Sequence, residues 1–284
     1  MYEPVIGRYL RLPLDDVEHR VYIEEAGTGT PLLCLHTAGA DTRQWRHVMN
    51  DPAITSRFRV IAFDLPYHGK SSPPAGYQND DYRLTADRYM ATVMGVIDAL
   101  ALERPIVTGC SIGGRVVLHL ALHHADRLGG LIGLETGAHV DPYYDLDWLD
   151  RPDVHGGMVC AAIVSGLIAP DCPDADRHET LWHYLQSGPG VFKGDLFFYV
   201  DDGDIRGRLH DIDTSVCPMV LLTGEFDYSC TPSDTLAVAE AVPDVSATIM
   251  RGLGHFPMSE DYPRFRPYFL EALDQVVTRS AGNR

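Results

Sequence analysis

The chain has 284 residues, of which 45% are hydrophobic and 22% charged, as is usual for a globular protein that buries a sizeable core. Its 23 basic and 40 acidic residues give a formal net charge of −17, which argues against nucleic acid or an anionic membrane as a partner. The chain contains no uncharged apolar run of the roughly 18 residues that span a membrane, and no basic segment followed by an apolar one at its start, so we expect a cytoplasmic protein.

Strand patterns and helix patterns alternate along most of the chain. Alternating or continuous apolar runs predict strands over residues 7–12, 19–26, 32–36, 58–63, 105–109, 130–135, 218–223 and 245–250, with Gly27-Thr28-Gly29-Thr30 as the turn of the first two. Helical spacing predicts helices over 42–50, 85–102, 112–124, 233–241 and 260–277. This alternation is typical of an α/β fold with a mainly parallel sheet.

The alternation lapses between residues 138 and 215. An acidic and aromatic stretch over 141–153 precedes helix patterns over 157–169 and 176–186. Gly188-Pro189-Gly190 then breaks the chain before four aromatic residues, which are Phe192, Phe197, Phe198 and Tyr199. Large aromatic side chains need a surface to bury against. We therefore expect a packed helical insertion here, with a solvated excursion as the alternative.

The segment Gly109-Cys110-Ser111-Ile112-Gly113 has the pattern G-x-S-x-G, between a predicted strand and a predicted helix. A strand that turns this sharply into a helix needs residues without a Cβ beside the turn. Ser111 would then lie at the tip of the turn with its hydroxyl exposed. This context favours a nucleophile over a serine that merely caps a helix.

A serine hydroxyl needs a base, and the base needs an orienting acid. Asp227 and His255 each follow the end of a predicted strand, where ligands collect in open α/β sheets. The chain order Ser, Asp, His is the one found in α/β-hydrolases. Two other residues remain alternatives for the acid: Glu225, two positions before Asp227, and Glu135, at the end of the sixth strand.

Four landmarks make the chain resemble the α/β-hydrolase fold family over nearly its whole length. They are the strand and loop Leu32–Gly39, the segment Val60–Ser71, the G-x-S-x-G turn, and the pair Asp227 and His255. Two positions depart from the family pattern: His36-Thr37 stands where His-Gly is usual, and Pro66-Tyr67 where Pro-Gly is usual. The resemblance implies a mostly parallel eight-stranded sheet with helices on both faces and a helical cap after strand 6. The corresponding division is a core of 1–137 and 216–284, with the cap over 138–215.

The resemblance also implies a mechanism and an oxyanion hole. His255 would take the proton of Ser111, with Asp227 orienting the imidazole. Backbone N–H groups of Ile112 and Ala38, with Thr37 next, would bind the oxyanion. No metal or organic cofactor is needed. His119 and His123 share a helix face but have no third ligand nearby, and the six cysteines lack C-x-x-C spacing, so we expect no metal site and free thiols.

Six residues are candidates for substrate binding on this pattern. They are His36, Arg43, Tyr67, His68, Trp182 and Phe198. For His36, bracing of the oxyanion loop is the alternative. For Arg43, the choice lies between a solvated helix residue and an anchor for a substrate carboxylate.

The function predicted from these features is that of a serine hydrolase that cleaves a carboxylic ester or related acyl compound through an acyl-enzyme. Alternatives on the same site are a C–C bond hydrolase, a lactonase or a thioesterase, because the triad does not choose the substrate. A ligand-binding receptor or pseudoenzyme of the same fold is the alternative from another class. We expect a small-molecule acyl substrate and a monomer or homodimer.

Overall fold

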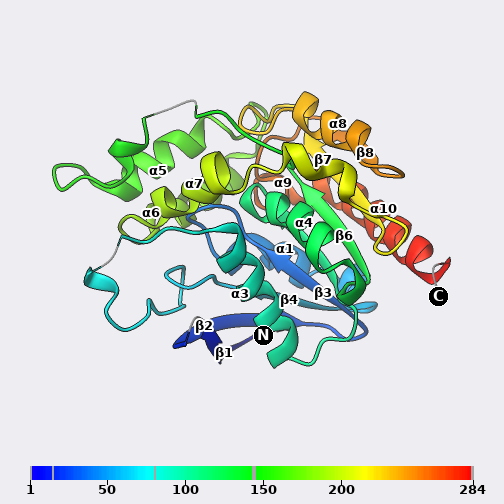
Figure 1. Ribbon diagram of the computed structural model, residues 1–284. Helices are drawn as coiled ribbons and strands as arrows, with labels where there is room; N and C mark the ends of the chain where they lie inside the picture. Colours follow the sequence, from blue (N-terminus) through cyan, green and yellow to red (C-terminus); the bar gives the residue numbers. More distant parts are fainter. Residues whose placement is uncertain (1, 15, 80, 143–144, 283–284) are drawn as a thin grey trace.

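The computed structural model describes residues 2–14, 16–79, 81–142 and 145–282, and an eight-stranded sheet organises them (Figure 1). The strands are β1 (Ile6–Leu14), β2 (Val17–Ala26), β3 (Thr30–Leu35), β4 (Phe58–Phe63), β5 (Ile106–Cys110), β6 (Gly130–Leu134), β7 (Met219–Gly224) and β8 (Ser246–Met250). Their order is β1-β2-β4-β3-β5-β6-β7-β8, with β1 and β2 antiparallel to their neighbours and the others parallel. This confirms the predicted mostly parallel α/β sheet.

Helices cover both faces of this sheet. On one face they are α3 (Ala86–Ala99), α4 (Ile112–His123) and α8 (Pro232–Ala241), and on the other α1 (Arg46–Met49), α2 (Pro52–Thr55) and α10 (Tyr262–Gly282). Successive strand residues point to opposite faces, so the apolar residues of β3 divide between two hydrophobic layers. Every residue of β5, β6 and β7 is buried, which explains their continuous apolar sequences.

The strand order changes direction at β3, in the centre of the sheet. β3 pairs with β4 on one side and with β5 on the other, so successive connections leave this point in opposite directions. In open α/β sheets, ligands bind outside the carboxyl ends of the strands at such a point. The turn that carries Ser111 follows β5 there.

The insert, which we define as residues 135–218 between β6 and β7, is largely helical. Its α-helices are α5 (Gly156–Ser165), α6 (Asp174–Leu185) and α7 (Val191–Phe197), and α7 continues into a π-helical turn over Phe198–Asp202. Figure 1 shows the three helices grouped on one side of the molecule, away from the C-terminus. Residues 143 and 144 of the predicted acidic stretch lie outside the described residues.

Three local expectations need correction. Gly27–Thr30 connects β2 to β3, where the amides of Thr28 and Thr30 donate to the carbonyls of Thr55 and Arg57. The predicted helix 42–50 is a 3₁₀ turn over Thr42–Trp45 followed by α1. The predicted helix 260–277 is two helices, α9 (Pro257–Glu260) and α10, because Asp261 leaves the helical conformation and its side chain accepts the Arg264 amide.

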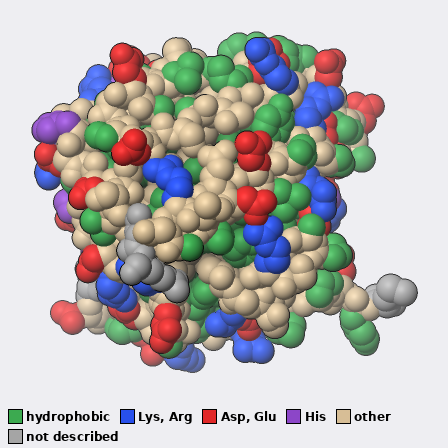
Figure 2. All heavy atoms as spheres, turned by 90° about the vertical axis from the view of Figure 1, so that its right-hand side faces the viewer, with side chains coloured by type: hydrophobic (Ala, Val, Ile, Leu, Met, Phe, Trp, Pro, Cys, Tyr) green, Lys and Arg blue, Asp and Glu red, His purple; other side chains and the backbone are tan. Residues whose placement is uncertain are grey.

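The lengths of the helices and the charges on the surface are relevant to membrane and nucleic-acid binding. None of the helices in the described ranges combines the length and apolar character required to cross a bilayer. Figure 2, which turns the right-hand side of Figure 1 toward the viewer, shows acidic and basic side chains interspersed among apolar ones. On this face the visible basic residues form no continuous patch of the kind that tracks a nucleic-acid backbone.

Candidate active site

Ser111 lies in a strained turn between β5 and α4. Its φ of 62° and ψ of −113° place a non-glycine residue in a sparsely populated region, which is typical of a nucleophile elbow. The amide of Ser111 donates to the carbonyl of Leu134 at the end of β6, 3.0 Å away. A Cβ on Gly109 would lie 2.5 Å from the backbone of Gly113, so the first glycine of the motif is required for the close approach of strand and helix.

His255 and Asp227 meet beyond the ends of β8 and β7. The Nδ1 atom of His255 lies 2.8 Å from Oδ2 of Asp227, and the two side chains are 4% and 0% exposed. The other carboxylate oxygen of Asp227 accepts the amides of Ser229 and Cys230 at 2.8 and 3.1 Å. The carboxylate is therefore held by the backbone while it faces the imidazole, as an orienting acid must.

The two alternative acids point elsewhere. Glu225 is at the surface, where it pairs with Arg251 at 2.6 Å and accepts the Gly252 amide at 3.0 Å. Glu135 is fully buried and binds the end of β7, with the Thr223 hydroxyl at 3.0 Å and the Gly224 amide at 2.9 Å. Burial and the negative charge of Asp227 raise the pKa of Glu135 well above its usual range. Of the three carboxyl groups, only Asp227 contacts His255 in the described structure.

Ser111 and His255 face one small cavity of about 20 Å³. Thr37, Ala38, Val164, Leu167, Tyr184, Phe192, Leu196, Tyr199, Ser229 and Phe256 complete its lining. A cavity of this size holds one or two water molecules. Within the described residues no hydrogen bond joins the Ser111 hydroxyl to the imidazole, and such contacts often tighten only when substrate binds.

The loop after β3 leaves one amide free beside the cavity. The Thr37 amide donates to Oε1 of Gln44 at 3.0 Å, the Gly39 amide to Oδ2 of Asp195 at 2.7 Å, and the Ala40 amide to the Thr37 carbonyl. The structure gives the Ala38 amide no acceptor among the described residues. Thr37 was predicted as a further oxyanion donor, but its N–H already donates to Gln44. The N–H groups of Ala38 and of Ile112, the first residue of α4, remain available as donors.

The two predicted histidines of the pocket belong to the wall behind this loop. His36 accepts the Leu65 amide at Nε2 and lies 2.8 Å from the Thr37 carbonyl through Nδ1, and burial lowers its pKa to about 4. His68 pairs with Asp195 at 2.7 Å, and both side chains are fully buried. Neither His36 nor His68 lines the Ser111 cavity. The ring nitrogens of both residues bind backbone or carboxylate groups instead.

The other four predicted substrate contacts also lie away from Ser111. Trp182 is 56% exposed on the outer side of α6, and Phe198 is buried against Tyr89 and His119. Arg43 binds Asp41 and Gln186. As substrate contacts these residues stay predictions. For Trp182 and Phe198, sequence spacing does not tell which face of an inserted helix meets the core.

Sequence analysis did not assign the apolar wall of the cavity. Tyr184, Phe192 and Leu196 come from α6 and α7, and Val164 comes from α5. Phe192 and Tyr199 were among the aromatic residues that predicted a packed insert, but they were not assigned to the cavity. Helical spacing of Phe192, Leu196 and Tyr199 was the available signal.

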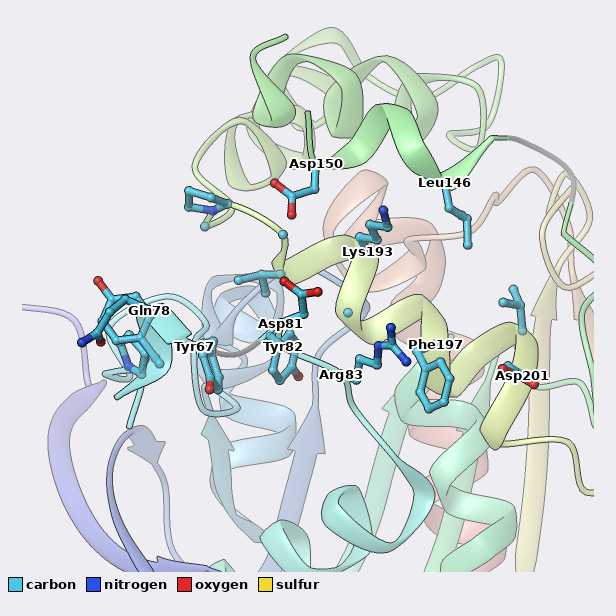
Figure 3. A pocket seen from close by; sticks show the side chains of 18 residues that line it. Tyr67, Gln78, Asp81, Tyr82, Arg83, Leu146, Asp150, Lys193, Phe197 and Asp201 are labelled. Carbon is cyan, nitrogen blue, oxygen red and sulfur yellow. The ribbon is translucent and has the colours of Figure 1, made fainter. Parts of the chain in front are cut away.

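Tyr67 lines a second, larger cavity of about 750 Å³ on the other side of α7 (Figure 3). Its labelled lining residues include Tyr82, Arg83, Asp150, Lys193 and Phe197, and it lies between the loop over 67–83 and the insert. Tyr67 and Tyr82 pack with ring centroids 4.4 Å apart. No lining residue is shared with the Ser111 cavity, so α7 separates the two spaces.

The histidine pair on α4 serves the fold. Nε2 of His119 lies 3.2 Å from the Gly203 carbonyl, and its ring packs on Phe198. Among the described residues, one group, His47, Asp176 and Glu179, brings possible metal-ligand atoms within 4.8 Å of one another. Glu179 already pairs with Arg46 at 2.7 Å.

Comparisons with known proteins agree with this architecture. A family model described as alpha/beta hydrolase fold matches residues 30–155. Over 116 residues the chain is 34% identical to the 2-hydroxymuconate semialdehyde hydrolase of Pseudomonas sp. (strain CF600), which covers 40% of this chain and 38% of that protein. The chain spans less than half the length of this and similar curated hydrolases.

Solved structures match over almost the whole chain. A thermophilic esterase from Thermogutta terrifontis has a TM-score of 0.80 at 22% identity, covering 95% of this chain and 99% of the esterase. The enol-lactonase from Burkholderia xenovorans LB400 has a TM-score of 0.78 at 19% identity, covering 94% and 100%. At these identities the likeness concerns the fold. With the family model and the strand order, it shows that the chain has the α/β-hydrolase fold.

Proposed function

We propose that the protein is a serine hydrolase that cleaves a carboxylic ester or related acyl compound. The observation that carries the proposal is the convergence on one cavity of Ser111 in a strained elbow, His255 bound to Asp227, and Ala38, whose amide has no acceptor among the described residues. Ile112, the residue after Ser111 at the start of α4, would supply the second amide. These are the nucleophile, base, orienting acid and oxyanion donors that acyl transfer requires.

In the proposed mechanism the Ser111 oxygen attacks the acyl carbon while Nε2 of His255 takes its proton. Asp227 accepts from Nδ1 and stabilises the imidazolium. The carbonyl electrons move onto oxygen, where the Ala38 and Ile112 amides bind the anion. Collapse of the intermediate expels the alcohol, which takes the proton from His255. Water then attacks the acyl-enzyme by the same steps in reverse order and releases the acid.

The shape of the cavity favours a small, uncharged acyl group. Its side walls are Val164, Leu167, Phe192 and Leu196, and its lining contains no Lys or Arg among the described residues. An unpaired carboxylate in such surroundings would lose several kcal/mol of hydration. Arg43, the predicted anchor, already binds Asp41. We therefore place an acetyl-sized acyl group at Ser111.

A hydrolase of C–C bonds is the second candidate, supported by the similarity to the curated semialdehyde hydrolase. Its substrate, as named, carries a carboxylate group, for which the Ser111 cavity offers no cation among the described residues. Lactonase and thioesterase activities use the same groups. Residues 138–215 of the insert are proposed as the cap that selects among these substrates.

The proposal is tested by labelling and by a substrate panel. A fluorophosphonate should modify the peptide that contains Ser111, and Ser111→Ala should abolish labelling and lower ester turnover by several orders of magnitude. The panel compares p-nitrophenyl acetate, butyrate and octanoate with a lactone, a thioester and 2-hydroxymuconate semialdehyde. Labelling elsewhere, or an active Ser111→Ala variant, contradicts the assignment. Labelling at Ser111 without turnover of any substrate would support a receptor or pseudoenzyme.

We further propose the cytoplasm as the compartment. All six cysteines are buried free thiols, as is usual in proteins of reducing compartments.

A further inference from the structure

Asp195 lies within α7, and its side chain is buried between the insert and the core. One carboxylate oxygen, Oδ2, accepts the amide of Gly39 and lies 2.7 Å from Nε2 of His68. The other, Oδ1, accepts the Tyr82 hydroxyl at 2.8 Å. A fully buried carboxylate is costly unless it is paired and hydrogen-bonded, and here three donors from the core satisfy it.

The Gly39 contact matters because of its position in the loop after β3. Thr37 is anchored to the core through Gln44, and Gly39 is anchored to the insert through Asp195. Ala38, which lines the Ser111 cavity and whose amide has no acceptor among the described residues, lies between these two anchors. The hydrogen bond of Thr37 to Gln44 and that of Gly39 to Asp195 therefore fix the direction of the Ala38 N–H bond.

Packing holds Asp195 at this place. Gly39 has a φ of 66°, and a Cβ there would lie 2.5 Å from the ring of Phe192, one turn before Asp195 on α7. A Cβ on Gly194 would lie 2.2 Å from the ring of Tyr82, so α7 approaches the core closely at its middle. The helix and the loop thus meet without room for another rotamer or a water layer.

His68 is the side chain that can balance the charge of Asp195. Burial lowers its pKa, but the charge of Asp195 and the hydrogen bond between them raise it more, so that the net shift is upward. His36 packs against His68 with ring centroids 4.8 Å apart, and it braces the Thr37 carbonyl of the same loop. The Asp195–His68 pair therefore lies directly behind the oxyanion loop.

We propose that Asp195 is a positioning residue for catalysis, through which the insert completes the oxyanion hole by fixing the loop that carries the Ala38 amide. The inference rests on the proposed hydrolase function. Asp195 does not touch the reacting atoms, and its effect passes through Gly39 to Ala38. In this enzyme the insert contributes to transition-state stabilisation as well as to substrate selection.

The test compares Asp195→Asn and Asp195→Ala with Asp147→Asn, a matched change at an exposed aspartate of the insert that pairs with Lys193. The readouts, per active site titrated with fluorophosphonate, are kcat, KM for p-nitrophenyl acetate, and the inhibition constant of methylboronic acid. A boronate bound to Ser111 is a tetrahedral anion, and it reports the oxyanion hole directly. Asp195→Ala should lower kcat by about 10²-fold, as loss of an oxyanion donor does, with KM changed less than threefold.

Asp195→Asn keeps an acceptor for Gly39 but loses the charge, so its kcat should fall by about tenfold and its boronate affinity in proportion. Asp147→Asn should match the parent. If the Asp195 variants keep the parental kcat and boronate affinity per titrated site, and lose only thermal stability, the positioning role is overturned. Should Asp195→Ala not fold, Asp195→Asn and Tyr82→Phe, which removes only the Oδ1 contact, give the same comparison. A parent without labelling or turnover would instead refute the hydrolase function itself.

Discussion

Glu135 and Asp227 are neighbouring buried carboxyl groups at the ends of β6 and β7, with exposed fractions of 0% and 2%. Burial and the charge of Asp227 raise the pKa of Glu135 well above its usual range, which favours the uncharged form of Glu135. The pair therefore divides two tasks. Glu135 binds the Gly224 amide and fixes the end of β7, while Asp227 faces His255 as the carboxylate.

The first prediction concerns this division. Asp227→Asn should keep the fold but lower kcat/KM by as much as about 10⁴, because an amide can stabilise the wrong tautomer of His255 and does not stabilise the imidazolium. Glu135→Gln should cost about tenfold, since Glu135 does not contact the imidazole. Glu225→Gln, at the surface, is the control. The measurement is kcat/KM at one pH, with circular dichroism to verify folding. A folded Asp227→Asn enzyme within tenfold of the parent, beside a disabled Glu135→Gln, would move the acid to β6.

The second prediction concerns acyl size. Leu196→Ala should enlarge the Ser111 cavity and raise kcat/KM for butyrate relative to acetate by roughly tenfold, since each added methylene then buries in an apolar space. The same change should destabilise the protein by about 2–4 kcal/mol, because Leu196 is buried. Trp182→Ala, at an exposed residue of the insert, should change neither quantity. An unchanged butyrate-to-acetate ratio in a folded Leu196→Ala enzyme would show that the acyl group binds elsewhere.

The third prediction concerns the elbow. Gly109→Ala should destabilise the protein by more than about 3 kcal/mol, because the added Cβ would lie 2.5 Å from backbone atoms of Gly113 that cannot move without unwinding α4. Gly207→Ala meets no atom within 4 Å and should be neutral to within about 0.5 kcal/mol. Urea unfolding of both variants measures the difference. Equal stability of the two would refute the close approach of strand and helix at the motif.

The fourth prediction concerns pH and the loop that carries His255. Glu260 is buried and accepts the Gly254 amide, and burial raises its pKa from 4.5 to about 7. The folded state thus holds a proton that the unfolded state releases. Its stabilising contribution is complete below pH 4.5 and is lost as pH rises through about 7.

Glu260→Gln, which cannot ionise, removes this dependence. The parent's free energy of unfolding should fall relative to that of Glu260→Gln by about 3 kcal/mol between pH 4.5 and pH 7.5. Denaturant unfolding of both proteins at a series of pH values gives the difference between their free energies of unfolding. The contributions of the other titrating groups cancel in this difference. A constant difference across this range would mean that Glu260 titrates normally in the folded protein.

Much of the fold and the core of the candidate site could be predicted from the sequence because both depend on local patterns. Continuous apolar runs are required for strands buried on both faces, so the order of elements followed from residue types alone. The glycines around Ser111 are dictated by the turn in which they lie, and they are visible as a motif for that reason. Asp227 and His255 became candidates because ligands bind beyond the carboxyl ends of parallel strands, and the structure brings these two side chains into contact.

Contacts between the insert and the core could not be predicted in this way. Phe192 and Phe198 are six residues apart on one helical segment, yet one lines the Ser111 cavity and the other packs on Tyr89. Trp182 and Tyr184 also point to different surroundings: Trp182 is exposed to solvent, and the Tyr184 hydroxyl is hydrogen-bonded to the hydroxyl of Thr37. Which side of a helix is buried depends on the surface that it meets, and that surface belongs to distant parts of the chain.

The sequence by itself determined the sheet, the turn at Ser111 and the positions of the candidate residues Asp227 and His255 after strand ends, because each rests on a local pattern of residues. Only the tertiary structure decided which carboxyl group reaches His255, which amide of the loop stays free, and that Asp195 holds that loop from 156 positions away. These depend on distances between side chains brought together by packing. Such distances cannot be predicted from the spacing of residues in the sequence.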